Sequence, residues 1–182
     1  RDSYRLDASS YDSINTNIAI SFSTIKFYED TISLIEKEIS KLIKGSSFET
    51  DINILKSIPG ISTVFATSII SELGDARSFK SDDALAKYSG IFWSENESGD
   101  FASEDHHLKK TGNVYLRYYI IEATSSVIHH NNVFYNFYSK KQNEVKTHKE
   151  SRALVLTSRK FIRLIFKLLK DKKLYEEPSS LN

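Results

Sequence analysis

Apolar residues recur at a regular spacing through the first quarter of the chain. The steps between them alternate between four and three residues, and eight of the nine positions are apolar. A 3.5-residue period sustained for four heptads predicts one long helix with a coiled-coil seam, although the same face could pack on the chain's own core. Gly45 and the serines after it predict the end of this helix. The seam consists of Ile14, Ile18, Ser21, Ile25, Tyr28, Ile32, Ile35, Ile39 and Leu42.

A turn between two shorter predicted helices comes next. The first helix should end before Pro59, because the residue that precedes a proline avoids the α region. Gly60 can supply the turn, and Ser62 or Thr63 can cap the second helix, which Gly74 can end. An apolar-Pro-Gly-apolar turn is typical of a helix-hairpin-helix motif, in which backbone N–H groups at a helix N-terminus bind phosphate. Gly60 and Ser62 are therefore candidate nucleic-acid contacts, with an ordinary structural corner as the other interpretation.

Helical patterns account for most of the remaining chain. Ser81 can cap a short helix that Ser89-Gly90 closes. The pattern lapses over residues 91–105, and a loop of that length inside a compact domain is usually functional or disordered. Three further helices are predicted, from Asn113 to His130, from Val133 to Lys141 and from Lys149 to Lys170.

These elements predict an all-α fold in which a long coiled-coil-like N-terminal helix precedes a compact helical domain. We expect a helical arm or coiled coil over residues 1–46, a helical domain with the helix-hairpin-helix-like motif over 47–175, and a tail over 176–182. The 182 residues are enough to bury a core. Because the sequence begins with Arg1 rather than Met, we expect it to be a piece of a longer protein.

Basic residues are concentrated in one part of the chain, although the net charge is only +1. From His106 to Tyr175 there are 15 Lys and Arg against 4 Asp and Glu, a balance of +11, and the rest of the chain has a balance of −10. Such an asymmetry indicates a nucleic acid, an anionic membrane or an acidic partner. In the last predicted helix a cationic stripe could follow a phosphate backbone, with a solvated face or a membrane-surface helix as alternatives. This stripe consists of Arg152, Arg159, Arg163, Lys167 and Lys170.

Composition excludes several kinds of chemistry. The hydrophobic fraction of 40% and the charged fraction of 27% are typical of a soluble globular protein rather than a disordered chain. The absence of cysteine excludes disulfides, zinc-thiolate sites and thiol nucleophiles. No apolar run approaches the ~20 residues of a membrane span, so no membrane partner is expected. The histidines of the pairs His106-His107 and His129-His130 would point ~100° apart on a helix, so no metal ligands are predicted.

A series of motifs between residues 52 and 130 adds a family resemblance. The motifs are Ile58-Pro59-Gly60-Ile61, Glu72-Leu73-Gly74-Asp75, Phe79-Lys80-Ser81, Leu85-Ala86-Lys87-Tyr88-Ser89-Gly90-Ile91, Ser98-Gly99 and Lys110-Thr111-Gly112-Asn113-Val114-Tyr115-Leu116-Arg117. In order and spacing they resemble the C-terminal domain of serine-type insertion-sequence transposases, the family that includes the Piv invertases and the RNA-guided bridge recombinases. Two features differ from the family pattern: His106-His107 replaces a glycine and a basic residue, and the loop around Ser98 is rich in acidic residues.

The resemblance implies a DNA transposase or site-specific recombinase that acts as part of a longer chain, with this piece alone inactive. In that family a serine of a Ser-Gly pair attacks a DNA phosphodiester and forms a covalent phosphoserine, and the pair falls here on Ser98. A neutral hydroxyl needs activation by a base or a metal. Lys110 and Arg117 are the candidate cations for stabilising transition-state charge, and Lys109 is a further expected nucleic-acid contact.

The resemblance also implies partners and a cofactor outside this chain. The family's N-terminal ribonuclease-H-like domain carries four acidic metal ligands, so Mg²⁺ is expected with that domain and no cofactor within this chain. DNA is the expected partner, and a guide RNA is a further one in the bridge recombinases. The N-terminal helix is expected to form a homo-oligomer. A cytoplasmic, nucleoid-associated location in a prokaryote would follow.

Two other functions fit the same residues. The chain could be a non-catalytic helix-hairpin-helix module that binds DNA without cutting it. It could also be an assembly protein whose coiled coil joins copies together while its basic face binds another acidic partner. A covalent protein–DNA adduct would separate the first function from the transposase, and the salt dependence of DNA binding would test the second.

Overall fold

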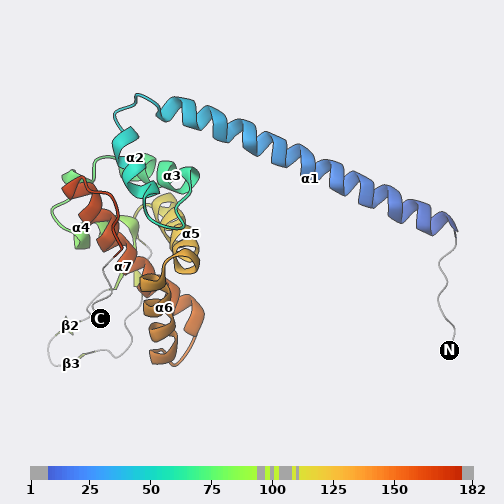
Figure 1. The fold of residues 1–182 in the computed structure, drawn as a ribbon. Helices are drawn as coiled ribbons and strands as arrows, with labels where there is room; N and C mark the ends of the chain where they lie inside the picture. The colour runs from blue at the N-terminus through green and yellow to red at the C-terminus, as the bar shows by residue number, and fades with distance from the viewer. Residues whose placement is uncertain (1–7, 94–96, 99–100, 103–107, 110, 178–182) are drawn as a thin grey trace. The chain divides into compact units, whose positions relative to one another are not determined.

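The computed structural model of the chain describes residues 8–93, 97–98, 101–102, 108–109 and 111–177 (Figure 1). The chain divides into two compact units, Arg1–Gly45 and Ser46–Asn182. The predicted all-α fold is confirmed, because helices make up nearly all of the regular structure in the described ranges. None of these helices is long and apolar enough to cross a membrane.

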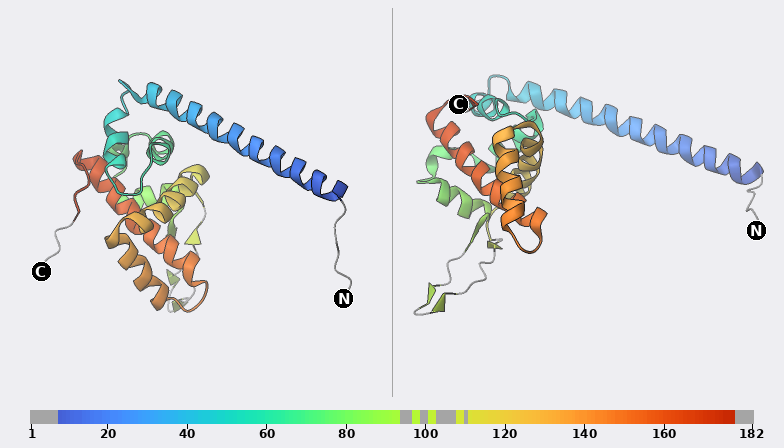
Figure 2. Two further views of the ribbon diagram at one scale, coloured as in Figure 1. Left: turned by 45° about the vertical axis from the view of Figure 1, so that its right-hand side comes forward. Right: turned by 60° about the horizontal axis from the view of Figure 1, so that its bottom comes forward.

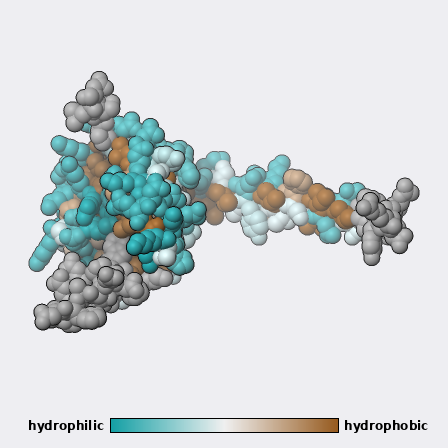
Figure 3. Space-filling view, turned by 90° about the horizontal axis from the view of Figure 1, so that it is seen from below, coloured by the Kyte–Doolittle hydropathy of each residue, from teal (hydrophilic) through white to brown (hydrophobic). Residues whose placement is uncertain are grey.

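A single helix, α1 (Ala8–Ile43), forms the described part of the first unit and confirms the long N-terminal helix. Its 36 residues include no glycine or proline, and it ends just before Gly45, whose φ of +76° suits a glycine. The seam residues lie on the surface of this helix, with Ile25 53% and Ile32 55% exposed. Figure 3 shows apolar side chains along it. None of the described residues of its own unit covers this apolar surface, and the coiled coil stays a prediction.

The helices of the second unit pack around its longest member. They are α2 (Glu49–Lys56), α3 (Thr63–Leu73), the 3₁₀ helix η1 (Ala76–Ser78), α4 (Asp82–Ser89), α5 (Val114–His130), α6 (Asn132–Glu144) and α7 (Lys149–Asp171). Helix α7 contacts α2, α4, α5 and α6 (Figure 2). It buries Phe161, Ile162 and Ile165, each no more than 1% exposed. Full burial of such a side chain stabilises a fold by about 1.5–3 kcal/mol, so α7 is the centre of the core.

The ends of α3 and α4 follow the predicted capping residues. The side chains of Ser62 and Ser81 each accept a hydrogen bond of 3.2 Å from a backbone N–H in the first turn of the helix that they begin. Gly74 and Gly90 follow the last helical residues with φ of +66° and +71°, as glycines after a helix commonly do. The local sequence therefore determines where both helices begin and end.

Four two-residue strands lie in the region where a loop was expected, residues 91–105 and just beyond. Strand β1 (Phe92–Trp93) pairs antiparallel with β4 (Leu108–Lys109), so the two ends of the region run side by side. Strand β2 (Glu97–Ser98) pairs antiparallel with β3 (Phe101–Ala102), with Ser98 opposite Phe101. The described parts of the region thus form two nested antiparallel pairings, which we call the β1–β4 hairpin, where a loop was expected. Strands of two residues are too short to carry a readable alternation of apolar and polar positions.

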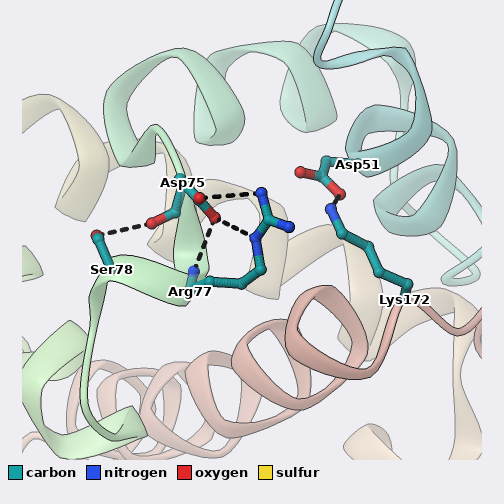
Figure 4. Close-up of polar contacts among 5 residues, drawn as sticks. All are labelled: Asp51, Asp75, Arg77, Ser78 and Lys172. Carbon is teal, nitrogen blue, oxygen red and sulfur yellow. Dashed lines mark hydrogen bonds and ion pairs between the residues drawn. The ribbon is translucent and has the colours of Figure 1, made fainter.

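Two groups of polar contacts lie near each other in the second unit (Figure 4). The Asp75 carboxylate accepts hydrogen bonds from Arg77 Nε (2.9 Å) and Nη2 (3.0 Å), and also from Arg77 N (2.9 Å). Ser78 Oγ donates to the Asp75 carbonyl (2.7 Å). These Arg77 hydrogen bonds hold the pKa of the Asp75 carboxyl below its ordinary value of 3.8. Nearby, the Lys172 ammonium at the end of α7 pairs with Asp51 of α2, so the two ends of this unit are tied together.

Candidate functional site

Two chain segments meet at the base of the β1–β4 hairpin, and we call residues 88–90 and 111–113 the hairpin root. Asn113 N donates a hydrogen bond to the Tyr88 carbonyl (2.7 Å), which joins the segment that enters the hairpin to the segment that leaves it. Ile91 N donates to the Ala86 carbonyl (2.9 Å), so the entering segment remains attached to α4. The β1–β4 pairing then continues from this base.

Two glycines allow the backbones of the hairpin root to touch. A Cβ atom on Gly90 would lie 2.5 Å from the Thr111 carbonyl oxygen and 2.6 Å from Arg117 Nη1. A Cβ on Gly112, whose φ is +127°, would lie 2.4 Å from the Tyr88 carbonyl oxygen and 2.9 Å from Gly90 N. Because these obstacles are mainly backbone atoms, the two segments of the root can approach this closely only with glycine at both positions.

The amide of Asn113 connects the hairpin root to α5 and α3. Asn113 Oδ1 accepts a hydrogen bond from Leu116 N (2.9 Å) and so caps α5, while Nδ2 donates to Glu72 Oε2 (2.9 Å) near the end of α3. Tyr88 OH lies beside both groups, 3.5 Å from Asn113 Nδ2 and 3.4 Å from the Glu72 carbonyl, and its ring packs against Phe79 at 5.3 Å. The root is therefore fixed to the ends of three helices. The functional interest of Glu72 and Tyr88 was missed in the sequence, although both lie within the motifs that carry the resemblance.

The candidate nucleophile lies beyond the hairpin root, on β2. The structure places the backbone of Ser98 opposite Phe101, but its side chain lies outside the described part of the molecule. Lys109 is described only through its backbone pairing with Phe92, and Lys110 lies outside the described residues. Arg117 is half-buried in the first turns of α5 and approaches Gly90. The roles of these four residues stay predictions.

The Pro59-Gly60 turn is held against α5. A Cβ on Gly60, whose φ is +93°, would lie 2.9 Å from both the Ser126 carbonyl oxygen and Val127 Cα, and the Gly60 carbonyl accepts a hydrogen bond from Ser126 Oγ (2.7 Å). This packing supplies a structural reason for the glycine. Ser62, by contrast, is exposed at the N-terminus of α3. Phosphate binding at this turn stays a prediction. The exposed N-terminus of α3 supports it, whereas Gly60 packs against α5.

Acidic residues of α4 pair with part of the cationic stripe on α7. Arg159 Nη1 lies 3.0 Å from Asp82 Oδ2, an ion-pair distance without hydrogen-bond alignment, and its Nη2 pairs with Asp83. Arg163 Nε donates to the same Asp82 Oδ2 at 3.2 Å. The Arg159 side chain is only 12% exposed, whereas that of Arg163 is 66% exposed. The sequence analysis identified Arg159 and Arg163 as members of the stripe but did not predict these pairings.

The other members of the stripe point to solvent. Arg152 and Lys167 are exposed, and Lys170 is exposed with its ammonium 5.3 Å from the centroid of the Phe166 ring. The stripe therefore contains two environments, one engaged in ion pairs with α4 and one open to a partner. DNA binding by Arg152, Arg159, Arg163 and Lys167 stays a prediction, and the exposed members are the more accessible to a phosphate.

Among the residues that the structure describes, no group of three or more His, Cys, Asp or Glu side chains is arranged to hold a metal ion. The expected absence of a cofactor within this chain stays a prediction.

A comparison with known proteins finds a family match for the part of the chain that contains the hairpin root. No curated protein matches the chain. Residues 52–139 match the family model described as the transposase IS116/IS110/IS902 family. The match begins within α2, ends within α6 and includes the complete hairpin and its root. This match supports a transposase family for the chain.

Proposed function

We propose that the chain is the DNA-binding and serine-nucleophile domain of a transposase that cuts and rejoins DNA through a covalent phosphoserine intermediate. The observation that carries the proposal is the transposase family match over residues 52–139, which spans the whole hairpin containing Ser98. Hydrogen bonds of the hairpin root attach the base of that hairpin to the ends of α3, α4 and α5. A serine on such a hairpin would be presented from a fixed platform rather than from a free loop.

The chemistry is a transfer of one phosphate ester bond to another. Ser98 Oγ would form a bond to the DNA phosphorus while the bond from phosphorus to the leaving sugar oxygen breaks. The serine proton would pass to a base, and the leaving sugar oxygen would take up a proton. The phosphoserine keeps the ester bond, so the reverse transfer to a new sugar hydroxyl needs no external energy source. Lys110 and Arg117 would stabilise the negative charge on the phosphate in the transition state.

Metal ions and further macromolecules belong to the rest of the proposed assembly. As the family resemblance implies, we assign Mg²⁺ to the acidic residues of a ribonuclease-H-like domain that would act together with this chain. DNA would bind the basic half of the chain, where Arg152 and Lys167 are exposed on α7. A guide RNA and self-association through α1 complete the proposal. The exposed seam of α1 supports the last point.

A covalent trapping experiment tests the nucleophile. The transposase that contains this chain is incubated with a duplex carrying the ends of its insertion sequence, denatured, and separated by gel electrophoresis. We expect a protein–DNA adduct whose phosphoserine maps to Ser98 by peptide mass spectrometry. Ser98→Ala should abolish the adduct. Ser94→Ala, a serine in the same segment, is the matched control and should retain it.

Other outcomes of the same experiment decide between the candidate functions. An adduct that survives Ser98→Ala would contradict the assignment of the nucleophile. If the longer protein cuts the DNA and this chain binds it specifically, but no adduct forms, the result would favour a non-catalytic helix-hairpin-helix module for this chain. The capped and exposed N-terminus of α3 at Ser62 is the observation that supports this second function.

A further inference from the structure

Two residues of the matching motifs, 41 positions apart, meet at the hairpin root. Asn113 Nδ2 donates a hydrogen bond of 2.9 Å to Glu72 Oε2, and both side chains are half-buried. We propose that this bond is a positioning contact, which holds the hairpin root in register against α3 and thereby orients the segment that carries Ser98. The inference about the contact stands on the described residues, and its consequence for DNA cleavage rests on the proposed function.

The orientation of the Asn113 amide follows from its second hydrogen bond. Oδ1 accepts from Leu116 N, which only the oxygen of an amide can do, so Nδ2 must face the opposite way, towards Glu72. A carboxylate acceptor makes this bond charge-assisted, and such bonds are roughly twice as strong as those between neutral groups. One side chain thus fixes the direction of α5 and the distance of the root from α3 at the same time.

A displacement of Asn113 would be transmitted to both arms of the hairpin. Asn113 N is bonded to the Tyr88 carbonyl, and the adjacent Gly112 has its backbone against Tyr88 and Gly90. Helix α5 is also held by the burial of Leu116, Ile120 and Val127, each no more than 1% exposed, so its packing does not rest on this bond alone. Loss of the bond is therefore expected to loosen the root while leaving the fold intact.

Exchanging the two polar groups separates the proposed contact from a simple helix cap. A cap alone would not depend on the residue at position 72. Asn113→Asp keeps an oxygen to cap α5, since aspartate is as good an N-cap as asparagine, but it sets two carboxylates against each other. Glu72→Gln keeps an acceptor for Asn113. In the double variant the new glutamine amide can donate to the new aspartate, which restores the bond with its direction reversed.

The first readout is amide hydrogen exchange in the 182-residue chain. For Asn113→Asp we expect exchange at Asn113 and along β1 and β4 to accelerate by about tenfold or more, with a smaller effect for Glu72→Gln. The double variant should return to within about threefold of the unmodified chain. If Asn113→Asp leaves exchange unchanged, or the double variant exchanges as fast as Asn113→Asp, the proposal is overturned.

A matched control exists at the start of α6. Asn131 caps that helix through Oδ1 and donates from Nδ2 to Tyr175 OH (2.7 Å), so it also joins a helix cap to a distant partner, here a neutral hydroxyl. Asn131→Ala removes both bonds, and it should lower the thermal unfolding midpoint without accelerating exchange in β1 and β4. Acceleration there would mean that the root responds to general destabilisation, and it would overturn the positioning role.

The second readout is the rate of covalent adduct formation by the transposase that contains this chain. It should fall in Asn113→Asp, fall less in Glu72→Gln and recover in the double variant. If Ser98→Ala leaves the adduct intact, the proposed nucleophile fails, but the hydrogen-exchange result still decides the Glu72–Asn113 contact. If the exchange pattern holds and the adduct rate does not follow it, the contact positions the root but not the reacting serine, and that part of the proposal is wrong.

Discussion

At the scale of single residues, Gly90 is subject to two constraints that can be separated by experiment. Its φ of +71° is disfavoured for residues with a side chain, and a Cβ would also collide with the Thr111 carbonyl. Gly45 has nearly the same φ, +76°, but a Cβ there would meet no atom within 4 Å. The pair therefore distinguishes backbone strain from the close approach of two chain segments.

We predict that Gly90→Ala destabilises the chain more than Gly45→Ala. Both variants pay the cost of a positive φ, about 1–2 kcal/mol. Gly90→Ala adds a steric cost of about 1–3 kcal/mol, because the obstructing atoms at the root are largely backbone. Urea denaturation of the two variants and the unmodified chain gives the difference. Equal losses would show that the root relaxes around a methyl group.

The Asp75–Arg77 pair makes a prediction about pH. Hydrogen bonds from Arg77 lower the pKa of Asp75 in the folded chain below 3.8. A group with a depressed folded pKa stabilises the fold above its unfolded pKa, and this contribution is lost as the pH falls through the folded pKa. Asp75→Asn removes the charge but keeps an oxygen that can cap η1.

The difference in unfolding free energy between the unmodified chain and Asp75→Asn should thus be constant near neutral pH. It should shrink as the pH falls below 3.8 and through the lowered pKa that Asp75 has in the folded chain. Denaturation curves measured across this range test the expectation. A difference that persists undiminished at the acid end would show that the charge of Asp75 is not its source.

At the scale of elements, α1 presents an apolar seam that a second copy could cover. Ile25 and Ile32 occupy the seam, whereas Phe27 and Leu34 are similarly exposed on another face of the same helix. We predict that Ile25→Asp with Ile32→Asp abolishes self-association, because charges in a coiled-coil seam are desolvated without partners. Phe27→Asp with Leu34→Asp should leave it intact.

Sedimentation over a range of concentrations measures this association. A chain that stays monomeric at every concentration would contradict the coiled coil. Equal effects of the two double variants would instead indicate association through no particular face of the helix.

The elements that local sequence determines were predicted well. The helix boundaries at Ser62, Gly74, Ser81 and Gly90 follow from capping residues within one turn of the chain, and they are confirmed. The contacts of the candidate site depend on residues far apart in sequence. Glu72–Asn113 joins positions 41 apart, and neither partner is unusual in its own segment.

Arg159 shows the same limit for charged residues. Its helical spacing placed it correctly in a cationic stripe, but its pairing with Asp83 spans 76 positions and follows from the packing of α4 on α7. The pairing of β1 with β4 escaped prediction for a related reason, because two residues are too few to establish a period. Tertiary contacts, rather than local propensity, decide these features.

At the scale of the whole molecule, the uneven charge of the chain predicts a salt-dependent affinity for DNA. The slope of log affinity against log salt should be negative and should become shallower by about 0.9 for each phosphate contact removed. Arg152→Gln and Lys167→Gln should each reduce the slope by roughly this amount without lowering stability, because both residues are exposed.

Arg159→Gln is the contrasting variant in the salt titration. It should mainly lower stability, since it leaves Asp82 and Asp83 without their principal partner on α7. Fluorescence anisotropy with a labelled duplex, paired with urea denaturation, separates the two effects. A slope of zero for the unmodified chain would contradict the basic face as a DNA-binding surface.

The contact between Gly90 and Gly112 leaves the length of chain between them free to vary. Since both ends are already held together, a longer insertion costs little loop entropy, about 0.6 kcal/mol for each doubling of its length. Related proteins could therefore lengthen, shorten or replace this segment during evolution while the supporting helices stay unchanged. For the protein engineer, the same two glycines mark the junctions at which a segment from a member of the matched family can be grafted.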